Sequence, residues 1–275
     1  MKKLLLASAV AALSITAAQA APTVYGKAFL TLDVQDGDDN SPDYDSRSKL
    51  NSNASRIGLK GSEALTQNTD LVYQLEYRVD IDSDAARNWE SRDTYLGLAN
   101  KQYGTLVAGR LTAIDDYVNY ANVTVGGVVG GDNVLATFDA PRANNSFAYF
   151  SPERNGLQFM GMYVLDENSD TKTATVNDPV YDKNGVQIGT TKREVTTKGT
   201  DSFGRDAFGV GAKYEPTNAP YKVGATYIQA GDDVKAIRVS GAYAASPVLT
   251  LGGLYQNADY DSDDNENAFT VSANY

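Results

Sequence analysis

Apolar and polar side chains alternate along most of this sequence, and this period limits the secondary structure that the chain can form. From Leu71 to Asp80 the apolar residues take one set of alternate positions and the polar residues take the other. Successive side chains of a β-strand point to opposite faces, so the segment predicts a strand with one apolar and one polar face. Twelve segments predict strands in this way: 23–34, 54–61, 71–80, 92–99, 105–110, 145–150, 156–165, 206–214, 221–229, 234–243, 250–257 and 267–275.

The connections between these segments alternate in length. Short turns alternate with longer loops, of which 111–144 and 166–205 are the longest, and 231–233 breaks the pattern by being short. Short turns on one side and long loops on the other are typical of an outer-membrane β-barrel. The structure of 167–203 stays open, as a flexible loop or a hairpin around Lys183-Asn184-Gly185.

The period alone does not separate a membrane barrel from a water-soluble sandwich, because both have one apolar face. The 18 tyrosines favour the barrel, since many of them lie in or beside the predicted strands. Tyrosine rings prefer the level of the lipid headgroups and form girdles there, although tyrosine is also common in strands generally.

The first residues form a targeting segment. Met1-Lys2-Lys3 is basic, Leu4 to Ala18 is apolar, and Ala18-Gln19-Ala20 is a cleavage motif. Together they predict a signal peptide over residues 1–20, cleaved after Ala20, that exports the chain through the periplasm. Removal of the two lysines changes the balance from 24 to 22 Lys+Arg against 35 Asp+Glu, so the formal charge changes from −11 to −13.

Composition excludes several classes of function. The chain has no cysteine and no histidine, which excludes thiolate nucleophiles, serine–histidine triads and most zinc sites. Its acidic balance argues against nucleic-acid binding. We therefore expect no enzyme, no cofactor and no metal.

Four segments resemble the Gram-negative general porins, in the order in which that family has them. They are Thr23–Lys27, Ser55–Glu63, Thr94–Leu98 with Tyr103–Arg110, and Arg142–Tyr149. The resemblance implies an all-β, transmembrane, antiparallel outer-membrane β-barrel over residues 21–275. It also implies a homotrimer in contact with outer-membrane lipid and lipopolysaccharide, with the long third loop, about 111–141, folded into the pore.

The resemblance also implies a charged constriction. Arg56 and Arg110 match inward basic positions of the family, and strand alternation adds Lys27, Lys60, Arg78 and Arg142 as candidates for a basic wall. The loop supplies facing acids: Asp115, Asp116, Asp132 and Asp139. Facing rows of opposite charge would set a field across a narrow aqueous gap and bias which ions enter. Alternatively, these basic residues form salt bridges that tie the loop to the wall, and the two roles are compatible.

The length leaves two alternatives open. The family usually has 16 strands, so the chain is either a truncated 16-strand porin or a complete 12-strand barrel. Its last residues alternate through Phe269, Val271, Ala273 and Tyr275, and both this aromatic end and the even strand number fit a complete barrel.

We expect a porin that lets ions and small hydrophilic solutes diffuse passively across the outer membrane. One alternative is a non-channel surface barrel, an adhesin or structural protein that acts through its long acidic loops. Another is a soluble secreted sandwich that binds a partner. Cation or anion preference is undecided, because the loops are acidic and the candidate wall is basic.

Overall fold

The computed structural model describes residues 22–35, 47–82, 89–123, 138, 140, 142–165, 172–181, 187–197, 207–231, 234–260 and 265–275. Residues 1–21, with the predicted signal peptide, lie outside this part. No helix in the described part is long and apolar enough to cross a membrane.

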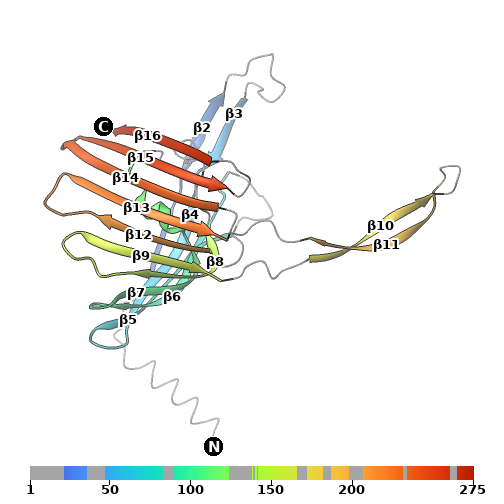
Figure 1. The fold of residues 1–275 in the computed structure, drawn as a ribbon, viewed down its shortest axis with the longest axis horizontal. Coiled ribbons are helices and arrows are strands. Elements are labelled where there is room, and N and C mark those ends of the chain that lie inside the picture. The colour runs from blue at the N-terminus through green and yellow to red at the C-terminus, as the bar shows by residue number, and fades with distance from the viewer. Residues whose placement is uncertain are drawn as a thin grey trace, which may run out of the picture.

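Twelve strands form one antiparallel sheet in which each strand pairs with its neighbours in sheet order (Figure 1). In that order they are β1 (Thr23–Lys27), β4 (Arg56–Ala64), β5 (Thr69–Arg78), β6 (Glu90–Asn100), β7 (Gly104–Leu111), β8 (Ala143–Phe150), β9 (Leu157–Val164), β12 (Ala207–Tyr214), β13 (Tyr221–Ala230), β14 (Val234–Ser246), β15 (Leu249–Tyr260) and β16 (Asn265–Asn274). Each of the twelve predicted segments overlaps one of these strands, which confirms an antiparallel sheet of twelve strands.

Two further hairpins lie outside this sheet. The strands β2 (Leu30–Gln35) and β3 (Arg47–Ser52) pair with each other, and so do β10 (Lys172–Tyr181) and β11 (Gln187–Thr197). The β10–β11 hairpin projects away from the sheet in Figure 1. The segment predicted as one strand over 23–34 therefore divides between the sheet and a separate hairpin, and 167–203 contains a hairpin.

Connection length differs between the two ends of the sheet. At one end the turns are 65–68, 101–103, 151–156, 215–220 and 247–248. The other end carries the longer connections, among them the one between β7 and β8, with 231–233 and 261–264 as the short exceptions. This is the asymmetry that the sequence predicts.

The sheet has its apolar side chains on the exposed face and its polar side chains on the covered face, the opposite of a water-soluble protein. The 3-10 helix η1 (Ile114–Val118) contacts one face, which we call the lumen face, and the opposite face is the outer face. In β14 the outward Ile237 and Val239 are each 47% exposed, whereas the inward Arg238 and Ser240 are 2% and 3% exposed. Apolar side chains outward and polar side chains inward are the arrangement of a membrane barrel.

Exposed aromatic side chains gather at both ends of the strands. Tyr103, Tyr149 and Tyr243 are exposed near the short turns, and Tyr149 donates a hydrogen bond to the Tyr103 carbonyl. Trp89 and Tyr163 are exposed near the longer connections. The two groups match the expected headgroup girdles.

The sheet has two edges. β1 pairs with β4 and β16 pairs with β15, and no ladder joins β1 to β16 within the described residues. A bilayer does not tolerate unpaired strand edges, so membrane insertion requires a hydrogen-bonding partner for both.

Candidate functional site

The segment after β7 runs inside the curved sheet. Residues 112–123, which we call the strap, include η1 and lie on the lumen face of β9 and β12–β15. The strap begins the long connection in which the sequence places a constriction loop.

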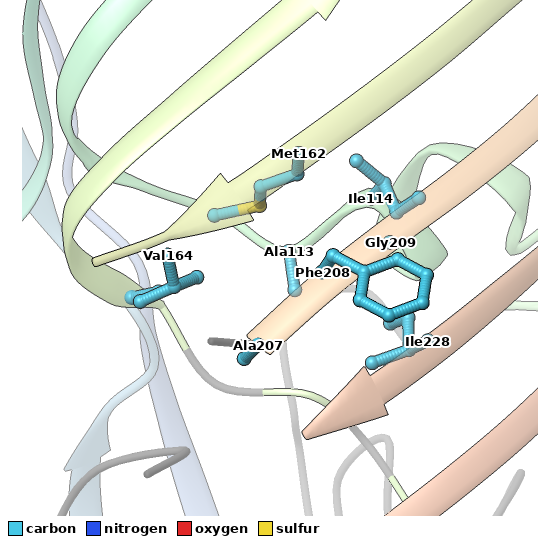
Figure 2. A pocket seen from close by; sticks show the side chains of 9 residues that line it. Ala113, Ile114, Met162, Val164, Ala207, Phe208, Gly209 and Ile228 are labelled. Carbon is cyan, nitrogen blue, oxygen red and sulfur yellow. The ribbon is translucent and has the colours of Figure 1, made fainter. Parts of the chain in front are cut away.

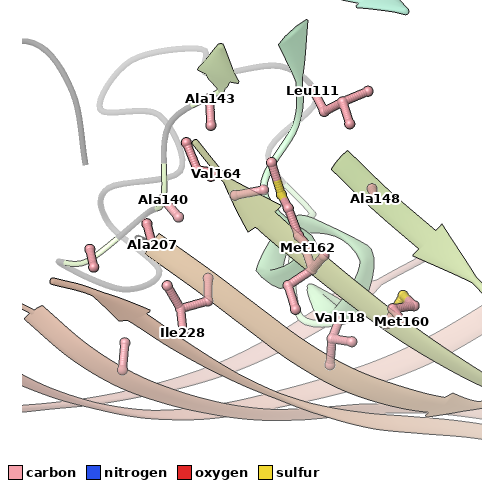
Figure 3. Close-up of a cluster of buried hydrophobic side chains, with 14 of the residues drawn as sticks. Leu111, Val118, Ala140, Ala143, Ala148, Met160, Met162, Val164, Ala207 and Ile228 are labelled. Atoms are coloured by element: carbon pink, nitrogen blue, oxygen red, sulfur yellow. The ribbon is translucent and has the colours of Figure 1, made fainter. Parts of the chain in front are cut away.

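Apolar side chains seat the strap on the wall. Ile114 and Val118 are 1% and 0% exposed and belong to a cluster of buried side chains between strap and sheet (Figure 3). Two glycines of the wall make room for them, because a Cβ at Gly209 would lie 2.8 Å from Ile114 Cδ1 and a Cβ at Gly224 would lie 2.9 Å from Val118 Cγ1. Close packing therefore fills this side of the lumen.

A small void remains in that packing. It measures about 20 Å³ and is lined by apolar groups of the strap, β9, β12 and β13, including Ile114, Met162 and Ile228 (Figure 2). A space of this size holds no solute larger than water, so this part of the wall offers no passage.

A buried ion pair joins the strap to β14. The Arg238 guanidinium lies 3.3 Å from Asp115 Oδ2 and donates hydrogen bonds to the carbonyls of Asp115 and Phe138. It also donates to Gln256 Oε1, and Gln256 in turn donates to the Phe138 carbonyl. Both charges are almost fully buried, so each depends on the other and on this network.

The opposite side of the lumen face is charged. Glu76 of β5 accepts hydrogen bonds from Tyr25 of β1 (2.9 Å) and from Arg92 of β6 (2.6 Å), and Arg56 of β4 lies 3.6 Å from it. Four neighbouring strands thus contribute to one network across the wall.

A β-bulge builds the next part of this wall. Between the pairs Leu75↔Thr94 and Tyr77↔Ser91, β5 has the single residue Glu76 and β6 has both Arg92 and Asp93. Where two residues of one strand oppose a single residue of the next, their side chains do not alternate strictly between the two faces of the sheet. Arg92 therefore reaches Glu76, while Asp93 accepts hydrogen bonds from Thr112 of the strap and from Arg142.

Four of the predicted wall residues share the lumen face of β1, β4 and β5. In the strand register Lys27 lies opposite Arg56, and Arg56 lies opposite Arg78. Gly58 and Lys60 follow Arg56 at alternate positions of β4, so Lys60 points to the same face as Arg56. Lys60 lies over the Tyr25 ring at 5.3 Å, and Arg78 pairs with Asp80. Arg142 joins the neighbouring Asp93 network.

Arg110 lies elsewhere. The alternation in β7 puts it on the opposite face from the buried Val107 and Leu111. Its guanidinium donates to the Ser91 carbonyl and to Asn144 Oδ1. The structure therefore does not bring Arg110 together with Arg56 and Lys60.

The predicted acids of the loop are divided as well. Asp115 is buried against Arg238, whereas Asp116 is exposed. Asp132 and Asp139 lie outside the described residues.

A further charged group lies on the wall near the 215–220 turn. Lys213 contacts Glu215 at 3.0 Å, and Lys222 lies 5.0 Å from the Tyr120 ring of the strap. Burial alone would raise the pKa of the Glu215 carboxyl, but its hydrogen bond to Lys213 and the nearby charges outweigh burial and hold that pKa below its ordinary value. Burial, with the charge of Glu215, raises the pKa of Tyr120.

Sequence reasoning missed Arg92, Asp93 and Arg238. Strand alternation in 234–243 could have placed Arg238 inward with Ala236 and Ser240. Nothing local indicates its partner Asp115, which is 123 residues away along the chain.

Comparison with known proteins gives a consistent result. A family model described as Gram-negative porin matches residues 6–275. The major outer membrane protein of Pasteurella multocida (strain Pm70) is 30% identical over 201 residues, which cover 69% of this chain and 52% of that protein. This chain thus spans about half the length of that relative.

Solved porin structures have a similar fold. Salmonella typhi OmpF, in complex with daunomycin, aligns with a TM-score of 0.57 at 19% identity, over 91% of this chain and 70% of that chain. An anion-selective porin from Comamonas acidovorans aligns with a TM-score of 0.52 at 18% identity, over 92% and 83% of the two chains. At these identities the likeness concerns the fold alone.

Proposed function

The chain belongs to the Gram-negative porin family, and on that premise we propose that it forms a water-filled channel for passive diffusion of ions and small hydrophilic solutes. Porins of this family are proteins of the Gram-negative outer membrane, which is therefore its location. The family's members are channels rather than enzymes.

The division of the lumen face is the observation that carries this proposal. The strap packs apolar side chains against β9 and β12–β15, whereas the wall of β1, β4 and β5 presents Lys27, Arg56, Lys60 and Arg78. Charged side chains require water or partners, so the aqueous path runs between the strap and this charged wall. Fixed charges along a narrow aqueous path are what a selective pore needs.

We further propose that residues 111–141 form the constriction loop, which is fixed to the sheet through its first part, the strap. The exposed Asp116 then faces the gap, while Asp115 serves to anchor the loop. In this proposal Lys60, which is exposed, carries a free charge on the wall, whereas Arg56 is paired within the wall, with Glu76 of β5.

Single-channel recording tests the channel. Purified protein, refolded in detergent and added to planar bilayers, should give discrete conductance steps of uniform size. Folding is checked beforehand by the shift in electrophoretic mobility on heating. Folded protein that gives no steps would contradict the channel and favour a surface barrel that acts through its loops.

The assembly and the export signal belong to the same proposal. We propose a homotrimer whose apolar outer face contacts lipid and lipopolysaccharide, and cleavage after Ala20. Light scattering of the detergent complex should give three copies, and mass spectrometry of the exported protein should give a chain that starts at Ala21.

A further inference from the structure

A second cavity lies beside the charged path, between the strap and the lumen face of β5–β8. Its volume is about 340 Å³, at the lower end of the range for small-molecule sites. Unlike the void under η1, it is large enough for one ring with a short side chain. Thr112 and Tyr117 of the strap form one wall of it.

Aromatic and aliphatic groups line most of this cavity. Tyr95, Tyr117 and Phe150 contribute rings, and Val72, Val107 and Leu111 contribute aliphatic surface. The Tyr117 and Phe150 rings lie edge to face at 5.2 Å. Aromatic faces attract both apolar groups and cations, which is an unusual lining beside an ion path.

Among the described residues that line the cavity, Asp93 is the one whose side chain is charged at neutral pH. Its hydrogen bonds from Thr112 (2.6 Å) and Arg142 (2.8 Å) both go to Oδ1, so Oδ2 is available to accept another within the described part of the chain. Burial, together with the charge of Asp93, raises the pKa of Tyr117 to about 12. The cavity therefore has a negative polar end and aromatic walls.

We propose that this cavity binds small organic ammonium ions that carry an apolar or aromatic body, with the ammonium group on Asp93 and the body against the Tyr117 and Phe150 rings. The negative charge of Asp93 at the cavity surface favours a cation. Arg142 contacts Asp93 from outside the cavity lining, so it places no positive charge on that surface. The rings supply apolar burial and cation–π attraction. Such solutes would be held beside the aqueous path while inorganic ions pass.

Three probes separate charge from apolar body. Phenethylammonium carries both, ethylammonium carries the charge without the ring, and phenylacetate carries the ring with the opposite charge. Calorimetric titration of the folded protein in detergent should give saturable binding of phenethylammonium at least tenfold tighter than either of the other two. This measurement does not need ion conduction, so it stands even if the proposed channel function fails.

Variants locate the site. Asp93→Asn keeps an oxygen for Thr112 and Arg142 but removes the charge, and Tyr117→Ala removes a ring; each should weaken phenethylammonium binding about tenfold. Tyr117→Phe keeps the ring and should bind as the unaltered protein does. Phe147→Leu, on the outer face of the same strand as Phe150, and Glu90→Gln, an exposed carboxylate, are matched controls that should change nothing.

Two results would overturn the proposal. One is phenethylammonium binding that is as tight in Asp93→Asn and in Tyr117→Ala as in the unaltered protein. The other is phenylacetate binding as tight as phenethylammonium binding, which would assign recognition to the ring or to Arg142 instead of Asp93.

Discussion

Arg238 holds the strap through a charge that has no access to water. Replacing it with methionine leaves the Asp115 carboxylate buried without its cation. Breaking one side of a buried pair typically costs about 3–5 kcal/mol. Arg238→Met should therefore lower the free energy of unfolding by that amount, measured by urea titration of the protein in lipid or detergent.

A double variant provides the control for Arg238. Arg238→Met combined with Asp115→Asn removes both charges and keeps a side-chain oxygen for the Ala140 amide, which donates to Asp115. It should be more stable than Arg238→Met alone. A single variant as stable as the unaltered protein would show that the pair contributes nothing.

Glu215 gives the protein a pH dependence in the acid range. Its pKa in the folded protein lies below the ordinary value of 4.5 because of Lys213, so the folded state favours the charged form. The resulting stability is complete above pH 4.5 and is lost as the pH falls through the folded pKa. The stability difference between unaltered protein and Glu215→Gln should thus be present at pH 7 and shrink below pH 4.5.

Melting temperatures across that pH series measure this effect. Glu215 is about one-third exposed, so the difference at pH 7 should be small. A difference that grows as the pH falls would contradict the assignment.

Strand alternation predicted only part of the charged wall. It placed Lys27, Lys60 and Arg78 inward, and the ladder registers put them on one face with Arg56, which the family resemblance had indicated. It could not place Arg92 and Asp93, because a bulge breaks the alternation between β5 and β6 and the sequence does not mark the bulge.

The elements of the sheet were predictable because their pattern is local. Each strand repeats its own alternation, and each short turn limits where the next strand begins. The β2–β3 hairpin was missed because β3, with the sequence RSKLNS, has one apolar residue and so little alternation to detect. The seat of the strap was also missed, since it joins residues far apart along the chain.

Adjacent glycines of β15 test that seat. A Cβ at Gly252 would lie 2.9 Å from Ala121 Cα and 3.0 Å from the Tyr120 carbonyl oxygen, whereas a Cβ at Gly253 would meet nothing within 4 Å. Gly252→Ala should therefore cost about 1–3 kcal/mol of stability through overpacking. It should also make the strap more sensitive to protease.

Gly253→Ala is the matched control, because it makes the same change one residue away on the outer face. Its stability should stay within about 0.5 kcal/mol of the unaltered protein. Equal effects at both positions would argue against close packing of the strap on β15.

For the molecule as a whole, the account predicts where ion selectivity arises. Lys60 lies on the lumen face, whereas Arg110 lies on the opposite face of β7. Lys60→Ser should move the reversal potential in a salt gradient toward cations, and the shift should grow at low salt because screening weakens. Arg110→Ser should leave it unchanged. The reverse order would contradict the assignment of the basic wall.

The central claim is that an aqueous path runs along the lumen face of β1, β4 and β5. The chain has no cysteine, so Lys60→Cys and its neighbour Leu59→Cys each introduce a single thiol, on opposite faces of β4. The direct measurement is single-channel current during addition of a charged, water-soluble methanethiosulfonate reagent. The account predicts stepwise loss of current for Lys60→Cys and none for Leu59→Cys; an unchanged current for Lys60→Cys, or equal loss for both, would contradict it.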